Sequence, residues 1–103
     1  MIEAVDDAVL DPLIHELARL RICAILSSTT AVEARTLKET TGISDSALSK
    51  HLRRLADAQY VTQSLGEPHG PGRPRTWVAL TEHGRSAYAR HIRALQRLTE
   101  PTP

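Results

Sequence analysis

The sequence predicts an α+β domain, mainly α-helical, in the order helix, short strand, helix, helix, strand, strand, helix. Two observations carry this prediction. Apolar residues recur at intervals of three and four through most of the chain, which is the period of an amphipathic helix. After Gln59 the period changes to two, and a segment rich in proline and glycine separates two strand-like runs, which is typical of a β-hairpin.

The size and composition of the chain indicate one globular domain. Its 103 residues leave room for a single core, and 41% hydrophobic with 24% charged residues is close to the average for soluble proteins. We expect an acidic N-terminal segment at 1–10, a domain at 11–98 and a disordered tail at 99–103. The start lacks the basic residues and the long apolar run of a secretory signal, so a cytoplasmic protein without a membrane segment is expected.

Residue types that support catalysis or metal binding are not grouped along the chain. Cys23 is the single cysteine and lies among apolar residues, so we expect it in the core. His83 and His91 are eight residues apart, too far for one helix to chelate a metal through both, and the remaining histidines fall on different elements: His15, His51 and His69. With no phosphate loop, serine elbow or HExxH motif, we expect neither an enzyme nor a metal or other cofactor.

The first helix is expected to start at Asp11-Pro12, because aspartate accepts hydrogen bonds from first-turn amides and proline suits the first helical position. It should reach Ser27 or Ser28, with a bend near Glu16 to Arg19. The residues at 27–32 are turn formers followed by β-branched types, so they predict a loop and a short strand.

A helix-turn-helix is indicated by the segment around Gly42. A helix at 33–41 should end at this glycine, which favours a left-handed C-terminal cap, and Ser44 should cap a third helix spanning about 45–58. Ile43 can pack onto Leu48 as a hydrophobic staple. One helix therefore ends and the next begins within about three residues.

The period of the third helix separates two kinds of side chain. Leu48, Leu52 and Leu55 should face the core, and basic and hydroxyl residues should face solvent. The second of two such helices can enter the major groove of DNA. We expect Ser46, Ala47 and Lys50 at base edges, and Ser49, Arg53 and Arg54 at phosphates, with Ser44 beside them. His51 could join either group or pack at the edge.

The hairpin has strand-like runs at 60–65 and 75–80 and a tip at 66–74 that alternates proline and glycine. The tip and its flank offer His69, Arg73 and Arg75 as further DNA contacts. Arg73, between Gly72 and Pro74, suits the minor groove, because a narrow groove concentrates negative potential. Although the net charge of the chain is only +1, residues 49–76 carry five basic residues against two acidic ones, which gives this stretch a positive local charge.

Thr81 should start a last helix, with Tyr88, Ile92, Leu95 and Leu98 facing inward. A short chain usually buries leftover apolar helical surface against a second copy. We therefore expect these residues to share core and dimer contacts, with Leu10 and Leu13 from the other end of the domain joining the dimer interface.

Four stretches resemble the MarR/ArsR-type winged helix-turn-helix transcriptional regulators. They are Leu37–Ser44, Leu48–Leu55, Gly72–Thr76 and Leu80–Arg85, within a resemblance that covers about 11–98. The resemblance implies a winged-helix fold, a homodimer, and repression or activation of nearby genes, sometimes relieved by a small molecule. In the larger MarR proteins long terminal helices interlock the dimer and frame a ligand pocket, whereas the flanks of this chain are short.

Together these observations predict a homodimeric, sequence-specific regulator that binds double-stranded DNA. Two alternatives remain at this point. One is a winged helix that serves as a protein–protein adaptor, which should expose an apolar patch on the third helix. The other is a repressor gated by a metal or an unidentified small-molecule effector.

Overall fold

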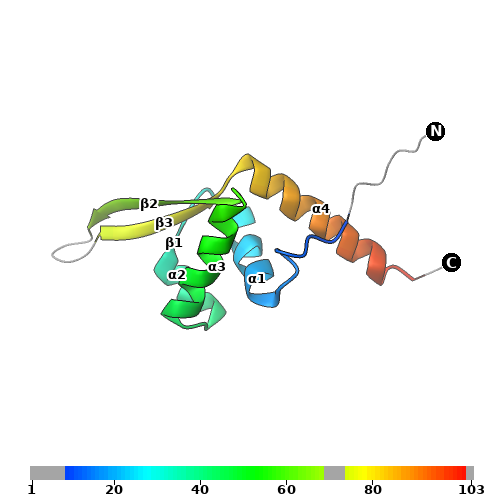
Figure 1. The fold of residues 1–103 in the computed structure, drawn as a ribbon, viewed down its shortest axis with the longest axis horizontal. Coiled ribbons are helices and arrows are strands. Elements are labelled where there is room, and N and C mark those ends of the chain that lie inside the picture. Colours follow the sequence, from blue (N-terminus) through cyan, green and yellow to red (C-terminus); the bar gives the residue numbers. More distant parts are fainter. Residues whose placement is uncertain (1–8, 69–73, 102–103) are drawn as a thin grey trace.

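The computed structural model describes residues 9–68 and 74–101 and contains the predicted order of elements (Figure 1). They are α1 (Leu17–Ser27), β1 (Val32–Glu33), α2 (Ala34–Thr41), α3 (Asp45–Asp57), β2 (Val61–Pro68), β3 (Pro74–Leu80) and α4 (Glu82–Thr99). The predicted fold class, a mainly helical α+β winged helix, is confirmed. No helix among the described residues is long and apolar enough to cross a membrane.

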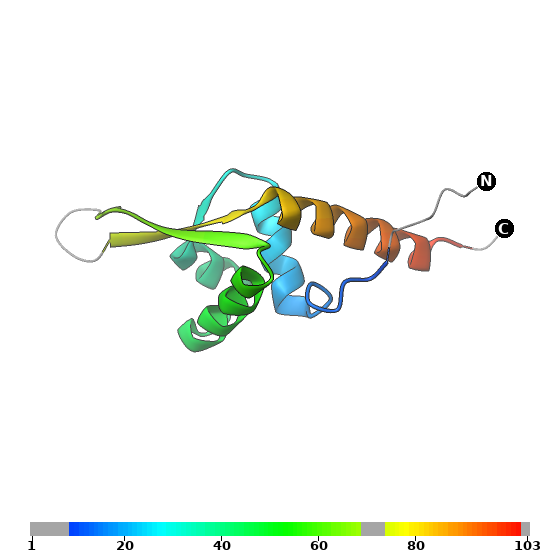
Figure 2. The same ribbon diagram turned by 45° about the horizontal axis from the view of Figure 1, so that its top comes forward.

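The three strands form one antiparallel sheet in the order β1-β3-β2. Val32 pairs with Val78, and Val61 pairs with Leu80, so the central strand β3 joins the short strand to the hairpin. In both ribbon views the β2–β3 hairpin projects from one end of the molecule and α4 from the other, with α1, α2 and α3 between them (Figures 1 and 2).

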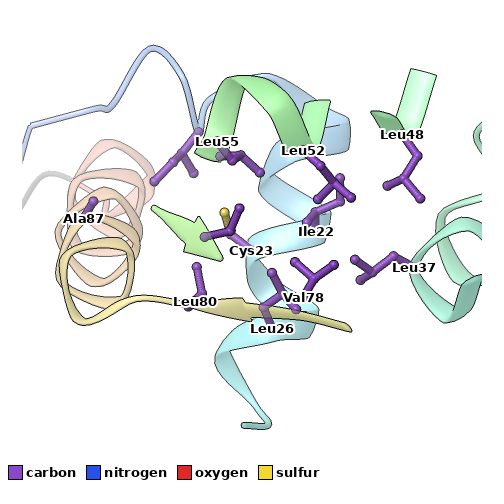
Figure 3. Close-up of a cluster of buried hydrophobic side chains, with 12 residues drawn as sticks. Ile22, Cys23, Leu26, Leu37, Leu48, Leu52, Leu55, Val78, Leu80 and Ala87 are labelled. Carbon is purple, nitrogen blue, oxygen red and sulfur yellow. The ribbon is translucent and has the colours of Figure 1, made fainter. Parts of the chain in front are cut away.

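The core lies where the first three helices meet the base of the sheet (Figure 3). Leu48, Leu52 and Leu55 of α3 are buried there, as their spacing predicts. Cys23 is completely buried in the same cluster, and burial raises the pKa of its thiol to about 12, so the thiol stays protonated and behaves as a small apolar group. The predicted core role of Cys23 is confirmed.

The start of the first helix differs from the prediction. α1 begins at Leu17, after Glu16 accepts a hydrogen bond from the backbone N–H of Arg19 at 2.9 Å. Residues 11–16 form a separate feature, called here the N-terminal turn. Asp11 does cap it, through Oδ1 and the amides of Leu13 and Ile14. The Asp11-Pro12 signal was therefore right for one turn and wrong for a helix, because the chain changes direction at the predicted bend and a second cap takes over.

The buried face of α4 is also different from the predicted one. The helix buries Gly84, Ala87, His91 and Ala94, whereas Leu98 is 67% exposed. Tyr88, Ile92 and Leu95 are only half-buried. Glycine and alanine let a helix backbone approach its neighbours closely, so the face with Gly84, Ala87 and Ala94 packs inward together with His91, and the predicted large apolar face stays partly open.

Candidate nucleic-acid interface

The turn between α2 and α3 has the local geometry that its sequence predicts. Gly42 adopts the left-handed conformation (φ 75°), and its N–H donates to the carbonyl of Lys38 at 2.9 Å. Ser44 is extended, and its hydroxyl accepts from the N–H of Ala47 at 3.1 Å. These two caps end one helix and start the next, which orients α3 relative to α2.

The outward face of α3 is polar and basic. Among the predicted DNA contacts on this helix, Ala47 is half-buried and the others are exposed: Ser44, Ser46, Ser49, Lys50, Arg53 and Arg54. No hydrogen bond or ion pair joins the three basic side chains to another residue in the described part of the chain. Their donors are therefore available to phosphates or base edges.

The first turn of α3 is tied to α2 by an ion pair. Lys38 Nζ lies 3.1 Å from Asp45 Oδ2, and the side chain of Asp45 is largely exposed. The aspartate also favours the positive end of the α3 dipole. An exposed pair of this kind contributes little stability.

His51 faces away from the polar surface of α3. Its Nδ1 lies 3.0 Å from Nη1 of Arg19, and its side chain is mostly buried. Arg19 is only 8% exposed and also donates from Nε to the carbonyl of Leu13. Sequence reasoning missed the role of Arg19, although a charged residue within the apolar run 17–26 was the available signal.

The wing is described only in part. Arg75 Nε lies 3.6 Å from Glu33 Oε2, with both side chains 28% exposed, so this arginine joins β3 to β1. His69 and Arg73 lie outside the described residues. Below the tip, a β-carbon on Gly66 would come within 2.6 Å of the indole Nε1 of Trp77, so the two residues are in direct contact across the hairpin. Trp77 thus packs within the wing.

The other end of the molecule carries the predicted dimer residues and a shallow hollow. Leu10 and Leu13 are half-buried near the start of the described chain. The hollow has a volume of about 340 Å³ and lies between this segment and α4, where Tyr60 and Arg90 contribute polar groups. The described residues contain no group of three or more metal-ligating side chains.

A family model described as a winged helix DNA-binding domain matches residues 18–99, which is most of the chain. The chain belongs to this family. The resemblance stated from the sequence motifs is therefore confirmed. The family is described by its winged-helix fold and by DNA binding. A search of curated protein sequences finds no match.

Solved structures of transcriptional regulators share the fold of this winged-helix domain. A transcriptional regulator homologue from Pyrococcus horikoshii OT3 superposes with a TM-score of 0.76 at 21% identity, over 84% of this chain and 83% of the other. The PcaV transcriptional regulator from Streptomyces coelicolor, solved with its natural ligand, gives 0.67 at 18% identity, over 89% of this chain and 59% of the other. The domain thus spans about three fifths of the length of PcaV. At these identities the likeness shows the shared fold.

Proposed function

We propose that the protein is a sequence-specific transcriptional regulator that binds double-stranded DNA as a homodimer, with α3 in the major groove. The observation that carries the proposal is the exposed face of α3, where Lys50, Arg53 and Arg54 have no partner among the described residues. A protein–protein adaptor would instead expose apolar side chains on this helix, whose large apolar residues are buried.

The proposed docking follows from the direction of α3. The major groove is roughly 12 Å wide and admits one helix, whose N-terminal residues come nearest to the bases. Ser46, Ala47 and Lys50 occupy the first two turns, so we assign them to base edges. Ser44 and Ser49, with Arg53 and Arg54 further along, are assigned to phosphates, which fix the position of the helix without reading sequence.

The wing is assigned to the neighbouring minor groove. Arg73 and His69 are proposed as contacts there, together with Arg75, the second residue of β3. If Arg75 binds a phosphate, it must break its ion pair with Glu33 or divide its donors between the two anions. Replacing Arg73 with alanine should weaken binding by roughly 1–3 kcal/mol. Unchanged affinity would remove the wing from the mechanism.

The homodimer is proposed to form through the open apolar side of α4. Tyr88, Ile92 and Leu95 are half-buried and Leu98 is 67% exposed, although they form a continuous apolar stripe along the helix. Leu10 and Leu13 are half-buried at the N-terminal end of the described chain and are assigned to the same interface. Burial of such a stripe against its own copy removes apolar surface from water in both subunits at once.

Regulation by a small-molecule effector is a second proposal, and the hollow beside Arg90 is the place to test it. PcaV was solved with a natural ligand, and in the present chain the hollow of about 340 Å³ is a place where a small molecule would contact both α4 and the N-terminal turn. A compound that binds there qualifies as an effector only if it also changes DNA affinity, because regulation requires differential affinity for two states.

Selection of bound duplexes from a random pool tests the proposed function directly. We expect enrichment of a two-fold symmetric site, with the spacing of its halves set by the dimer. On the selected duplex, affinity should fall steeply with salt, because each neutralised phosphate releases counterions. Failure to enrich any sequence, together with recovery of a stoichiometric protein partner, would favour the adaptor.

The matched control for the basic face is an arginine elsewhere on the surface. Arg53→Ala removes a charge from α3, and Arg93→Ala removes the same charge from an exposed position on α4. The first should weaken binding and flatten the salt dependence, whereas the second should do neither. Equal effects of the two substitutions would mean that net charge, and not the face of α3, determines binding.

A further inference from the structure

His91 connects α4 to the N-terminal turn through a contact that fixes its protonation state. The side chain is completely buried, and its Nδ1 accepts a hydrogen bond from the backbone N–H of Asp11 at 2.8 Å. A backbone N–H can only donate, so Nδ1 carries no proton and the neutral ring holds its proton on Nε2. Nε2 in turn lies 3.5 Å from Nδ1 of His15, with the two rings edge to face.

The described groups beside His91 already have hydrogen bonds of their own. Oδ1 of Asp11 already accepts from the amides of Leu13 and Ile14, and its Oδ2 accepts from the hydroxyl of Tyr60. The hydroxyl remains a donor, because burial and the Asp11 carboxylate raise the pKa of Tyr60 to about 12. A protonated His91 would therefore place an N–H on Nδ1 directly against the N–H of Asp11.

Charged and titratable groups reach this junction from α1 and the start of β2 as well as from α4 and the N-terminal turn. Cys23 of α1 is neutral, as its raised pKa shows. Arg90 of α4 acts on the Tyr60 hydroxyl at the start of β2. His15 and Asp11 act on His91 itself, both from the N-terminal turn. The carboxylate favours a proton on His91, and His15 and burial disfavour it.

The same turn is tied to α3 through a second histidine nitrogen without a proton. Arg19 donates to the carbonyl of Leu13 within the turn, and its Nη1 lies 3.0 Å from Nδ1 of His51 on α3. A guanidinium has only donors, so this contact also requires an unprotonated Nδ1. The N-terminal turn is thus joined to α4 directly through His91, and to α3 through Arg19 of α1, which bridges Leu13 and His51.

We propose that the N-terminal turn couples α4 to the DNA-reading helix α3, and that protonation of His91 in mild acid opens the coupling and weakens DNA binding. This inference rests on the proposed function. Burial, followed by His15, lowers the pKa of His91, which means that opening the junction favours proton uptake. By linkage, acid favours the opened form by the same amount.

The expected sign of the pH effect is opposite to the ordinary one. Protonation of surface histidines adds positive charge to a protein, and added positive charge tightens phosphate binding. Here affinity for the selected duplex should instead fall between about pH 7.5 and pH 5.5 at constant ionic strength. The loss of DNA affinity has an upper limit of about tenfold for each unit by which the pKa of His91 differs between the open and closed states.

His91→Asn is the variant that distinguishes protonation of His91 from protonation of other histidines as the cause of the pH effect. The Oδ1 of asparagine is attached to Cγ, as is Nδ1 of histidine, and it accepts a hydrogen bond at any pH. The acid-induced loss of affinity should disappear in this variant. His83→Asn is the comparison on the same helix: this exposed histidine packs against the ring of Tyr60, with ring centroids 5.1 Å apart, and within the described chain it makes no hydrogen bond with His91 or Asp11, so the variant should retain the loss. Identical pH profiles for wild type and His91→Asn, or a wild-type affinity that rises in acid, would overturn the proposal.

A measurement without DNA separates failure of this inference from failure of the proposed function. NMR of the histidine ring nitrogens in the wild-type protein should show His91 with its proton on Nε2 at neutral pH. The amide signal of Asp11 should lose its hydrogen-bonded shift as His91 titrates. An Asp11 amide that is unchanged through this titration would exclude opening of the turn, whether or not the protein binds any duplex.

Discussion

A β-carbon placed on Gly84 would collide with the carbonyl oxygen of Tyr60. This contact sets the distance between the start of α4 and the residues that follow α3. Thr81 strengthens it from the same side, because its N–H donates to the Tyr60 carbonyl at 2.9 Å and its hydroxyl donates to the Gln59 carbonyl at 2.7 Å. The junction between the end of α3 and the start of α4 thus depends on a position without a side chain.

Gly84→Ala should destabilise the protein by about 1–3 kcal/mol, because the added methyl group meets backbone that cannot rotate away. Urea unfolding followed by circular dichroism measures the loss. Gly42→Ala is the comparison: nothing lies within 4 Å of a β-carbon placed there, so only the left-handed backbone opposes the change, at a cost of about 1 kcal/mol. A smaller loss at Gly84 than at Gly42 would contradict the close approach.

Tyr60→Phe should cost about 1–2 kcal/mol of unfolding free energy, because the hydroxyl donates to the Asp11 carboxylate and the ring itself is retained. Tyr88→Phe is a suitable control, since no hydrogen bond of the Tyr88 hydroxyl is found within the described chain. Both variants can be compared by urea unfolding at neutral pH. Equal stabilities would mean that the Tyr60–Asp11 bond has no net effect.

The stability of the protein without DNA should fall as the pH is lowered through about 6.5. In the unfolded chain His91 has its ordinary pKa of 6.5, and in the folded protein burial lowers that pKa. The unfolded state therefore binds more protons in this range, which makes the free energy of unfolding rise with pH. Urea unfolding between about pH 5.5 and 7.5 measures the slope, and His91→Asn should reduce it.

Lys50→Ala should weaken binding to the selected duplex by about 1–3 kcal/mol and relax the preference at one position of the site, if Lys50 reads a base. Arg54→Ala should weaken binding to all duplexes similarly and lower the salt slope by about one. Fluorescence anisotropy across a set of single-base variants distinguishes these outcomes. The opposite pattern would exchange the two assignments along α3.

Leu95→Glu should shift the proposed dimer to monomers, because it places a charge in the apolar stripe of α4. Sedimentation velocity measures the change, and binding to the two-fold site should become weaker at the same time. Gln96→Glu adds the same charge at the adjacent exposed position and should leave the assembly intact. A wild-type protein that sediments as a monomer at all concentrations would remove the dimer from the proposed function.

The sequence predicts this fold best where the determining interactions are local. Gly42 and Ser44 act through their own backbone and the next turn, so the helix-turn-helix is visible in a few letters. The period of the leucines on α3 similarly depends only on helix geometry. These features also place the basic face of α3, which is why the candidate DNA contacts on this helix are exposed, apart from the half-buried Ala47.

The features that sequence reasoning missed depend on contacts between distant parts of the chain. Asp11-Pro12 has all the properties of a helix start, but whether the helix continues is decided by the direction that Glu16 and Arg19 impose. On α4 the spacing of the large apolar residues predicts that they are buried, whereas the close approach of Gly84 to Tyr60 places the face with Gly84 and Ala87 against the core. The period of a helix identifies which residues share a face, but it does not indicate how much room the neighbouring elements leave for that face.

The hairpin and α4 extend to opposite ends of the molecule (Figures 1 and 2). In a pair of subunits joined through α4, changes in this helix would alter how far apart the two copies of α3 sit, without touching any residue that meets a base. The spacing of the two half-sites would then depend on α4 and the sequence of each half-site on α3. Replacing α4 with that of a relative would change the spacing and leave the recognised sequence the same.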